Sequence, residues 1–155
     1  LISWEQASAI PWGVLLLFAG GITLAKGFVA SGLSTQVGEL LANLALVPTL
    51  FAIVMVAILV TALTEATSNT ATTALLMPIL AAASMAAQID PLILMVPAAM
   101  SASCAFMLPV ATAPNAVVFG TGQIGIQTMV RWGIWVNVLG VLVISAVVFG
   151  VTAAR

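Results

Sequence analysis

The chain has 155 residues but only seven charged side chains, and it contains no histidine and no tyrosine. Hydrophobic residues make up 63% of it and the mean hydropathy is +1.31, so an ordinary charged, water-facing surface cannot be assembled. Five of the six uncharged intervals between successive charges are at least 20 residues long, and roughly 20 apolar residues let a helix cross a bilayer. The sequence therefore predicts an all-α, polytopic protein embedded in a lipid bilayer.

Composition also excludes several kinds of function. Without histidine there can be no histidine-based triad, no histidine metal ligand and no imidazole proton relay. Asp90 is the only aspartate, so an aspartyl dyad is excluded as well. The single cysteine, Cys104, cannot close a disulfide within the chain, and a net charge of −1 does not favour nucleic-acid binding. We therefore expect neither enzyme activity nor a nucleic-acid partner.

The first apolar segment is expected over residues 11–33 and is interrupted by Gly20, Gly21 and Lys26. A glycine pair in such a segment permits close helix packing more often than it marks a binding site. The chain starts at Leu1 without a methionine, which suggests a fragment of a longer protein, although a natural protein of this length fits the same observation.

A helix predicted from Pro48 to Leu63 leads into an abrupt polar stretch, in which nine of the 13 residues from 61 to 73 are polar. Two complete spans joined by an exposed loop would fit this pattern. So would a re-entrant hairpin over about 48–88 with its tip at 64–70, and the density of short hydroxyls favours the hairpin. Ser68 and Asn69 are favoured helix N-caps, and a helix N-terminus can hold an anion without lysine or arginine.

A second interruption follows Asp90-Pro91, which reads as an N-cap and a first-turn proline. Pro109 and Pro114 predict a broken helix over about 91–125 with its break at 109–115, although a proline kink with a packing role is the alternative. In the broken form, freed carbonyls beside Thr112 and Asn115 are hard oxygen ligands suited to Na⁺. A clean last span is predicted over about 132–152.

Together, these residues resemble the C-terminal half of the divalent anion:sodium symporter family, close to its bacterial dicarboxylate transporters. The likeness covers about residues 11–150. It is carried by Thr64-Glu65, Ser68-Asn69-Thr70, Leu108-Pro109-Val110-Ala111-Thr112 and Pro114-Asn115.

The resemblance implies one of two inverted repeats of an elevator-type, homodimeric transporter, with the N-terminal repeat of the same transporter as partner. By position it implies substrate contacts and Na⁺ ligands in this chain. The substrate residues would be Ser68, Asn69, Thr70, Thr112 and Ala113, where Ala113 replaces a proline common in the family. The Na⁺ ligands would be Thr64, Thr67, Asn69 and Ala111, with Thr67 and Ala111 acting through backbone oxygens.

The function expected on this basis is Na⁺-coupled symport of a small dianion, such as the C4-dicarboxylate succinate, across the bacterial inner membrane. Citrate, sulfate and an exchange mode stay open. Glu65, an ionisable group at membrane depth, fits either a functional role or a structural one as an acceptor for backbone N–H groups. A Na⁺/H⁺ antiporter or anion-efflux protein that uses Glu65, or a non-transporting membrane fragment, are the alternatives.

Overall fold

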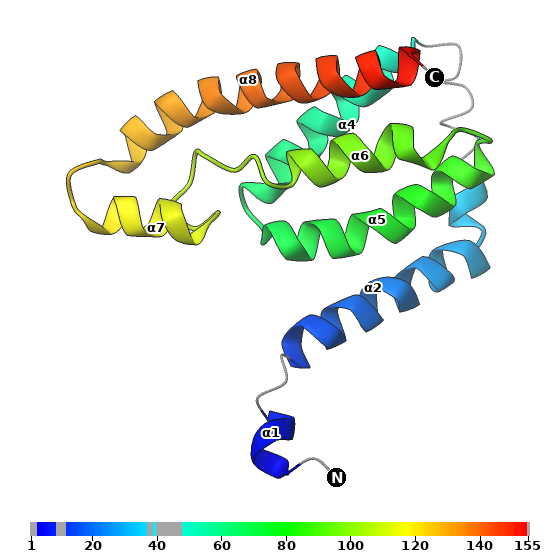
Figure 1. Ribbon diagram of the computed structural model, residues 1–155, viewed down its shortest axis with the longest axis horizontal. Helices are drawn as coiled ribbons and strands as arrows, with labels where there is room; N and C mark the ends of the chain where they lie inside the picture. The colour runs from blue at the N-terminus through cyan, green and yellow to red at the C-terminus, as the bar shows by residue number, and fades with distance from the viewer. Residues whose placement is uncertain (1–2, 9–11, 37–38, 40–47, 155) are drawn as a thin grey trace.

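The computed structural model describes residues 3–8, 12–36, 39 and 48–154, and the regular structure within these ranges is helical, without strands. The prediction of an all-α protein is confirmed. The helices are named as in Figure 1: α1 (Trp4–Ser8), α2 (Trp12–Ala30), α4 (Thr49–Thr64), α5 (Asn69–Ala86), α6 (Pro91–Ser101), α7 (Ala113–Gly120) and α8 (Ile126–Ala153).

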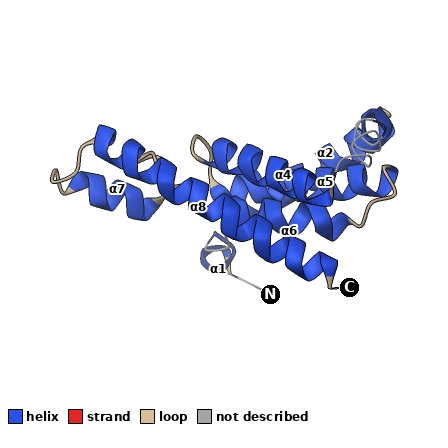
Figure 2. Cartoon of the chain, turned by 90° about the horizontal axis from the view of Figure 1, so that it is seen from above, coloured by secondary structure: helices blue, strands red, loops and turns tan. Residues whose placement is uncertain are grey.

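Helices α4, α6 and α8 pack against one another, and α5 packs on α6. The short segment 65–68 turns α4 back into α5, so that the two helices form a hairpin (Figure 1). Helix α2 lies against α5. Helix α7 extends the molecule at one end, beside the first turns of α8 (Figures 1 and 2).

Small side chains fill much of the helix interfaces. Val60 of α4 packs with Ala98 and Ala102 at the end of α6, and all three are buried. Large apolar side chains turn outward instead: Leu59 is 68% exposed and Leu139 is 61% exposed. Small residues at interfaces and large apolar residues outside are typical of helices that pack within a membrane, where lipid covers the outer surface.

Gly21 shows why small residues are needed. A Cβ at Gly21 would lie 2.7 Å from the carbonyl oxygen of Ala74 in α5, whereas a Cβ at the neighbouring Gly20 would meet nothing within 4 Å. Pro78 lies inside α5 and has no N–H to donate to that same carbonyl of Ala74. The packing interpretation of the glycine pair is therefore confirmed for Gly21, and α2 continues through both glycines and Lys26.

Among the described residues, two helices, α5 with 18 residues and α8 with 28, are long and apolar enough to cross a membrane. Helix α8 includes the whole interval 132–152. Helices α4 and α6 are apolar but shorter, with 16 and 11 residues. Asp90 caps α6 as predicted: its Oδ1 accepts a hydrogen bond from the Leu92 N–H at 2.9 Å, and Pro91 occupies the first turn.

The non-helical segment after α6 runs over residues 102–112. It overlaps the interruption expected at 109–115 but begins and ends earlier. Helix α6 stops at Ser101, before either proline, and Pro114 lies in the first turn of α7, where a missing N–H costs nothing.

A candidate ion and substrate site at two helix interruptions

Three oxygens meet where the α4–α5 turn touches the end of α6. The hydroxyl of Thr64, the last residue of α4, lies 2.6 Å from Asn69 Oδ1 and 2.8 Å from the carbonyl oxygen of Ala102. Thr64 is completely buried and Ala102 is 1% exposed. Because one hydroxyl has one proton to donate, it can serve only one of these two acceptors at a time. The remaining lone pairs form an oxygen-rich corner, lined by buried Thr64 and Ala102 and by half-buried Asn69.

Glu65 follows Thr64 and connects the turn to the non-helical segment. Its carboxylate accepts hydrogen bonds from the backbone N–H groups of Phe106, Met107 and Leu108 at 2.8–3.1 Å. A fourth donor is Asn137 Nδ2 of α8, at 2.6 Å. Glu65 is 3% exposed, and a buried carboxylate of this kind is stable only when donors surround it. Of the two roles expected for Glu65, the structure shows that of acceptor for backbone N–H groups.

Asn115 closes the other side of the non-helical segment. Its side-chain nitrogen donates to the carbonyl oxygens of Ala105 at 2.9 Å and Leu108 at 3.0 Å. The backbone N–H of Asn115 in turn donates to Thr112 Oγ1, the N-cap of α7, at 3.3 Å. The segment between α6 and α7 is therefore held from both ends, by Glu65 through its N–H groups and by Asn115 through its carbonyls.

The two other predicted ion ligands, Thr67 and Ala111, make hydrogen bonds of their own. The Thr67 hydroxyl donates to the carbonyl of Leu63 at 2.8 Å and lies 2.7 Å from the hydroxyl of Thr72. Ala111 is buried, in the turn that its N–H closes on the carbonyl of Leu108 at 3.2 Å. Among the predicted Na⁺ ligands, the hydrogen bonds of the described residues join Thr64 with Asn69.

The residues predicted to bind substrate begin two helices. Ser68 is the N-cap of α5, and Thr112 is the N-cap of α7. The two helices run away from each other, so their N-terminal ends face the middle of the molecule (Figures 1 and 2). Ser68, Thr70 and Ala113 are exposed, and Asn69 and Thr112 are half-buried. Helix N-termini carry free N–H groups and a partial positive charge, so this arrangement can attract an anion.

Three residues of this region were not predicted from the sequence: Ala102, Asn137 and Gly133. Nothing in the sequence distinguishes Ala102, whose contribution is a backbone carbonyl. Asn137 carried a signal, because an amide in the middle of an apolar helix needs a partner within the protein. Gly133 gave a weaker signal in the sequence, because glycine is common in membrane helices whether or not another segment packs against it.

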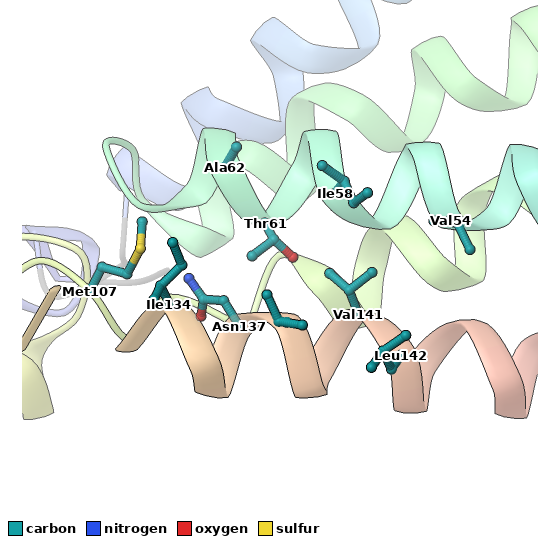
Figure 3. Close-up of a pocket in the computed structure, with 10 residues that line it drawn as sticks. Val54, Ile58, Thr61, Ala62, Met107, Ile134, Asn137, Val141 and Leu142 are labelled. Carbon is teal, nitrogen blue, oxygen red and sulfur yellow. The ribbon is translucent and has the colours of Figure 1, made fainter. Parts of the chain in front are cut away.

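A pocket of about 410 Å³ lies beside this region, between α4 and α8. In Figure 3 Asn137 rises from α8 between Met107 and Thr61, with aliphatic side chains along the rest of the wall. Thr61 Oγ1 and Asn137 Oδ1 are buried and have no hydrogen-bond partner among the described residues. The other side chains that line the pocket are apolar.

Comparison with known proteins fits this geometry. Residues 1–152 match the family model described as the sodium:sulfate symporter transmembrane region. The chain is 53% identical over 149 residues to the sodium-dependent dicarboxylate transporter SdcS of Staphylococcus saprophyticus, and 50% identical to SdcS of Staphylococcus aureus strain USA300. In each case 96% of this chain aligns with 29% of the relative. The chain therefore spans less than a third of the length of these relatives.

The resemblance expected from the sequence is confirmed. The matched family is one of symporters and not of enzymes, in agreement with the expectation from composition. The match covers nearly the whole chain, including both helix interruptions. This chain belongs to the sodium:sulfate symporter family of membrane transporters.

Proposed function

We propose that the chain forms one repeat, the C-terminal one, of a multi-pass transporter of the cell membrane that couples Na⁺ entry to uptake of a small dianion. The observation that carries this proposal is the meeting of Thr64 Oγ1, Asn69 Oδ1 and the Ala102 carbonyl at the ends of two interrupted helices. The relatives are named sodium-dependent dicarboxylate transporters, so succinate is the first substrate to test.

Na⁺ is proposed to bind at the oxygen-rich corner. An alkali cation prefers hard, neutral oxygens, and carbonyls at the C-terminal end of a broken membrane helix are used in this way. Ala102 is the C-cap of α6 and offers such a carbonyl. The backbone oxygens of Thr67 and Ala111 are the proposed remaining ligands. A cation there would accept lone pairs that the single Thr64 proton cannot satisfy.

The dianion is proposed to bind at the facing N-termini of α5 and α7. Donors available there are the hydroxyls of Ser68, Thr70 and Thr112, the amide of Asn69, and the backbone N–H of Ala113. None of these residues is basic, so the bound Na⁺ and the two helix ends would supply the positive potential. Because the bound Na⁺ would supply part of this positive potential, the cation is proposed to bind before the anion.

The rest of the transporter is proposed to complete the site. In this proposal the α4–α5 pair is a re-entrant hairpin whose tip lies at membrane depth, and the N-terminal repeat supplies a second, inverted half of the site. The assembled protein would work as a homodimer with an elevator-like movement. A plain loop at 65–68 would not need the buried Glu65 carboxylate or the buried Thr64 hydroxyl before it, because water would satisfy its backbone.

A proton antiporter would need a titratable group free to exchange protons in the membrane, and Glu65 is the only candidate beside the site. All four neighbours of its carboxylate are hydrogen-bond donors. Protonation of the Glu65 carboxylate would add a fifth hydrogen to a group that already accepts hydrogen bonds from these four donors. This contact pattern supports the symporter over the antiporter.

The test is uptake of labelled succinate by the complete gene product in liposomes. We expect accumulation under an inward Na⁺ gradient and none under an equal K⁺ gradient. Unlabelled citrate and sulfate, added in turn as competitors, identify the preferred dianion. Equal uptake in the two gradients would overturn Na⁺ coupling. A second assay follows proton movement in the same liposomes, and proton flux that depends on Na⁺ and disappears in Glu65→Gln would favour the antiporter.

A further inference from the structure

We propose that α8 sets the position of the non-helical segment 102–112, which leads to the proposed ion and substrate residues Ala111 and Thr112. In this proposal Asn137 is a positioning residue that acts through Glu65. This inference rests on the proposed function, because it concerns how the same site is held in place. Asn137 lies in α8, 72 residues from Glu65 in sequence. Within the described residues its side chain makes no hydrogen bond to either helix N-terminus, so its effect on binding would be indirect.

The first observation is the route of the hydrogen bonds. Asn137 Nδ2 donates to Glu65 Oε1 at 2.6 Å, and the same oxygen accepts from the N–H of Phe106 at 2.8 Å and Met107 at 3.0 Å. The second carboxylate oxygen accepts from the N–H of Met107 and Leu108, both at 3.1 Å. Asn137 is therefore the side-chain donor that fixes where Glu65 holds the segment leading to Ala111 and Thr112.

The second observation is the shape of the same face of α8. A Cβ at Gly133 would lie 2.7 Å from the carbonyl carbon of Phe106 and 2.8 Å from Met107 Cα. A Cβ at Gly140 would lie 3.2 Å from Cys104 Sγ. Gly133, Asn137 and Gly140 are at i, i+4 and i+7, which places them on one face of the helix. The non-helical segment thus lies directly on the α8 backbone, on either side of the Asn137 amide.

These contacts make α8 a template for the segment. Gly133 lets the backbone at 106–107 approach, and Asn137 orients the carboxylate that binds the N–H groups of 106–108. Glu65 also follows Thr64 directly, so a displaced carboxylate would disturb both sides of the oxygen-rich corner. Loss of the Asn137 amide is therefore expected to weaken Na⁺ binding, although Asn137 is not itself a ligand.

The experiment measures Na⁺-driven succinate uptake in liposomes by the complete gene product carrying Asn137→Ala. The expected result is a rise of about tenfold in the Na⁺ concentration for half-maximal uptake, the size usual for outer-shell partners of an ion site. The KM for succinate should rise with it, while maximal uptake per folded transporter at saturating Na⁺ stays near the wild-type value. Thr152→Val is the matched control, because among the described residues the Thr152 hydroxyl bonds to carbonyls of its own helix, those of Val148 and Phe149.

Variants that exchange the side chains of Asn137 and Glu65 distinguish a positioning role from a general effect on stability. Asn137→Asp places a second carboxylate against Glu65 and should be more severe than Asn137→Ala. Glu65→Gln combined with Asn137→Asp restores an amide–carboxylate pair and should recover part of the Na⁺ affinity. An unchanged Na⁺ dependence in Asn137→Ala would overturn the inference. Absence of Na⁺-dependent uptake in the wild type would instead overturn the proposed function.

Discussion

The side-chain amide of Asn115 donates a hydrogen bond, at 2.9 Å, to the carbonyl oxygen of Ala105. Pro109 lies four residues after Ala105 and has no N–H with which to satisfy that carbonyl in a continuous helix. Asn115 thus supplies a donor that the proline cannot. The proline interruption and the asparagine beyond it form one structural unit, in which the first creates an unsatisfied group and the second satisfies it.

Replacement of Asn115 by alanine should therefore destabilise the segment between α6 and α7. Ala105 is 1% exposed, and its carbonyl would lose its donor. This loss should lower the free energy of unfolding by about 1–3 kcal/mol. Thermal unfolding of the complete protein in detergent measures this as a lower Tm. Gln123→Ala, which removes an exposed amide in the following loop, is the control. An equal Tm for Asn115→Ala and the wild type would contradict the role of Asn115.

Gly21→Ala and Gly20→Ala should have opposite outcomes although they are neighbours. The added methyl at Gly21 would collide with the Ala74 carbonyl of α5 at 2.7 Å, and backbone cannot move aside cheaply, whereas the methyl at Gly20 meets open space. We expect Gly21→Ala to lower Tm, and Gly20→Ala to leave it unchanged or raise it slightly, since alanine favours helix by about 1 kcal/mol over glycine. Similar Tm values for both variants would refute the close contact between α2 and α5.

Asp90→Ala should weaken the start of α6. The Asp90 carboxylate accepts from the Leu92 N–H at 2.9 Å, and loss of such a cap costs about 1 kcal/mol. Asp90→Asn keeps an acceptor at the same position and should retain most of the stability. Comparison of the two Tm values with the wild type checks the cap. If the asparagine variant is as unstable as the alanine variant, the cap hydrogen bond is not what stabilises this end.

Thr61→Val should be neutral or stabilising. Thr61 is 5% exposed, and its hydroxyl has no partner among the described residues, so valine of nearly the same shape removes a buried, unsatisfied group. Ala57→Val, at a fully buried position of the same helix, adds volume and should lower Tm. A clear loss of Tm in Thr61→Val would mean that the hydroxyl has a partner outside the described residues.

Much of the fold could be predicted from patterns of charge and proline. Long uncharged intervals predicted membrane helices, Asp90-Pro91 predicted the start of α6, and the resemblance to the symporter family was confirmed over nearly the whole chain. These features depend on local sequence, in which a cap or a hydropathy pattern acts within a few residues.

The non-helical segment was harder to place, because long-range contacts fix it. The prolines indicated 109–115, yet α6 ends at Ser101, since the Glu65 carboxylate, which also accepts from Asn137, binds the N–H groups of 106–108 outside a helix. Glu65 is 41 to 43 residues away from these N–H groups in sequence. The Ala102 carbonyl was equally invisible, because a backbone atom leaves no mark in the sequence.

The Na⁺ dependence of succinate uptake by Thr64→Val tests the ion site most directly. Valine keeps the shape of threonine but removes the oxygen that lies 2.6 Å from Asn69 Oδ1 and 2.8 Å from the Ala102 carbonyl. Thr64→Ser, which keeps the hydroxyl, is the matched control. We expect the Na⁺ concentration for half-maximal uptake to rise about tenfold or more in Thr64→Val and to stay near the wild-type value in Thr64→Ser. Wild-type Na⁺ dependence in Thr64→Val would contradict a Na⁺ site at this corner.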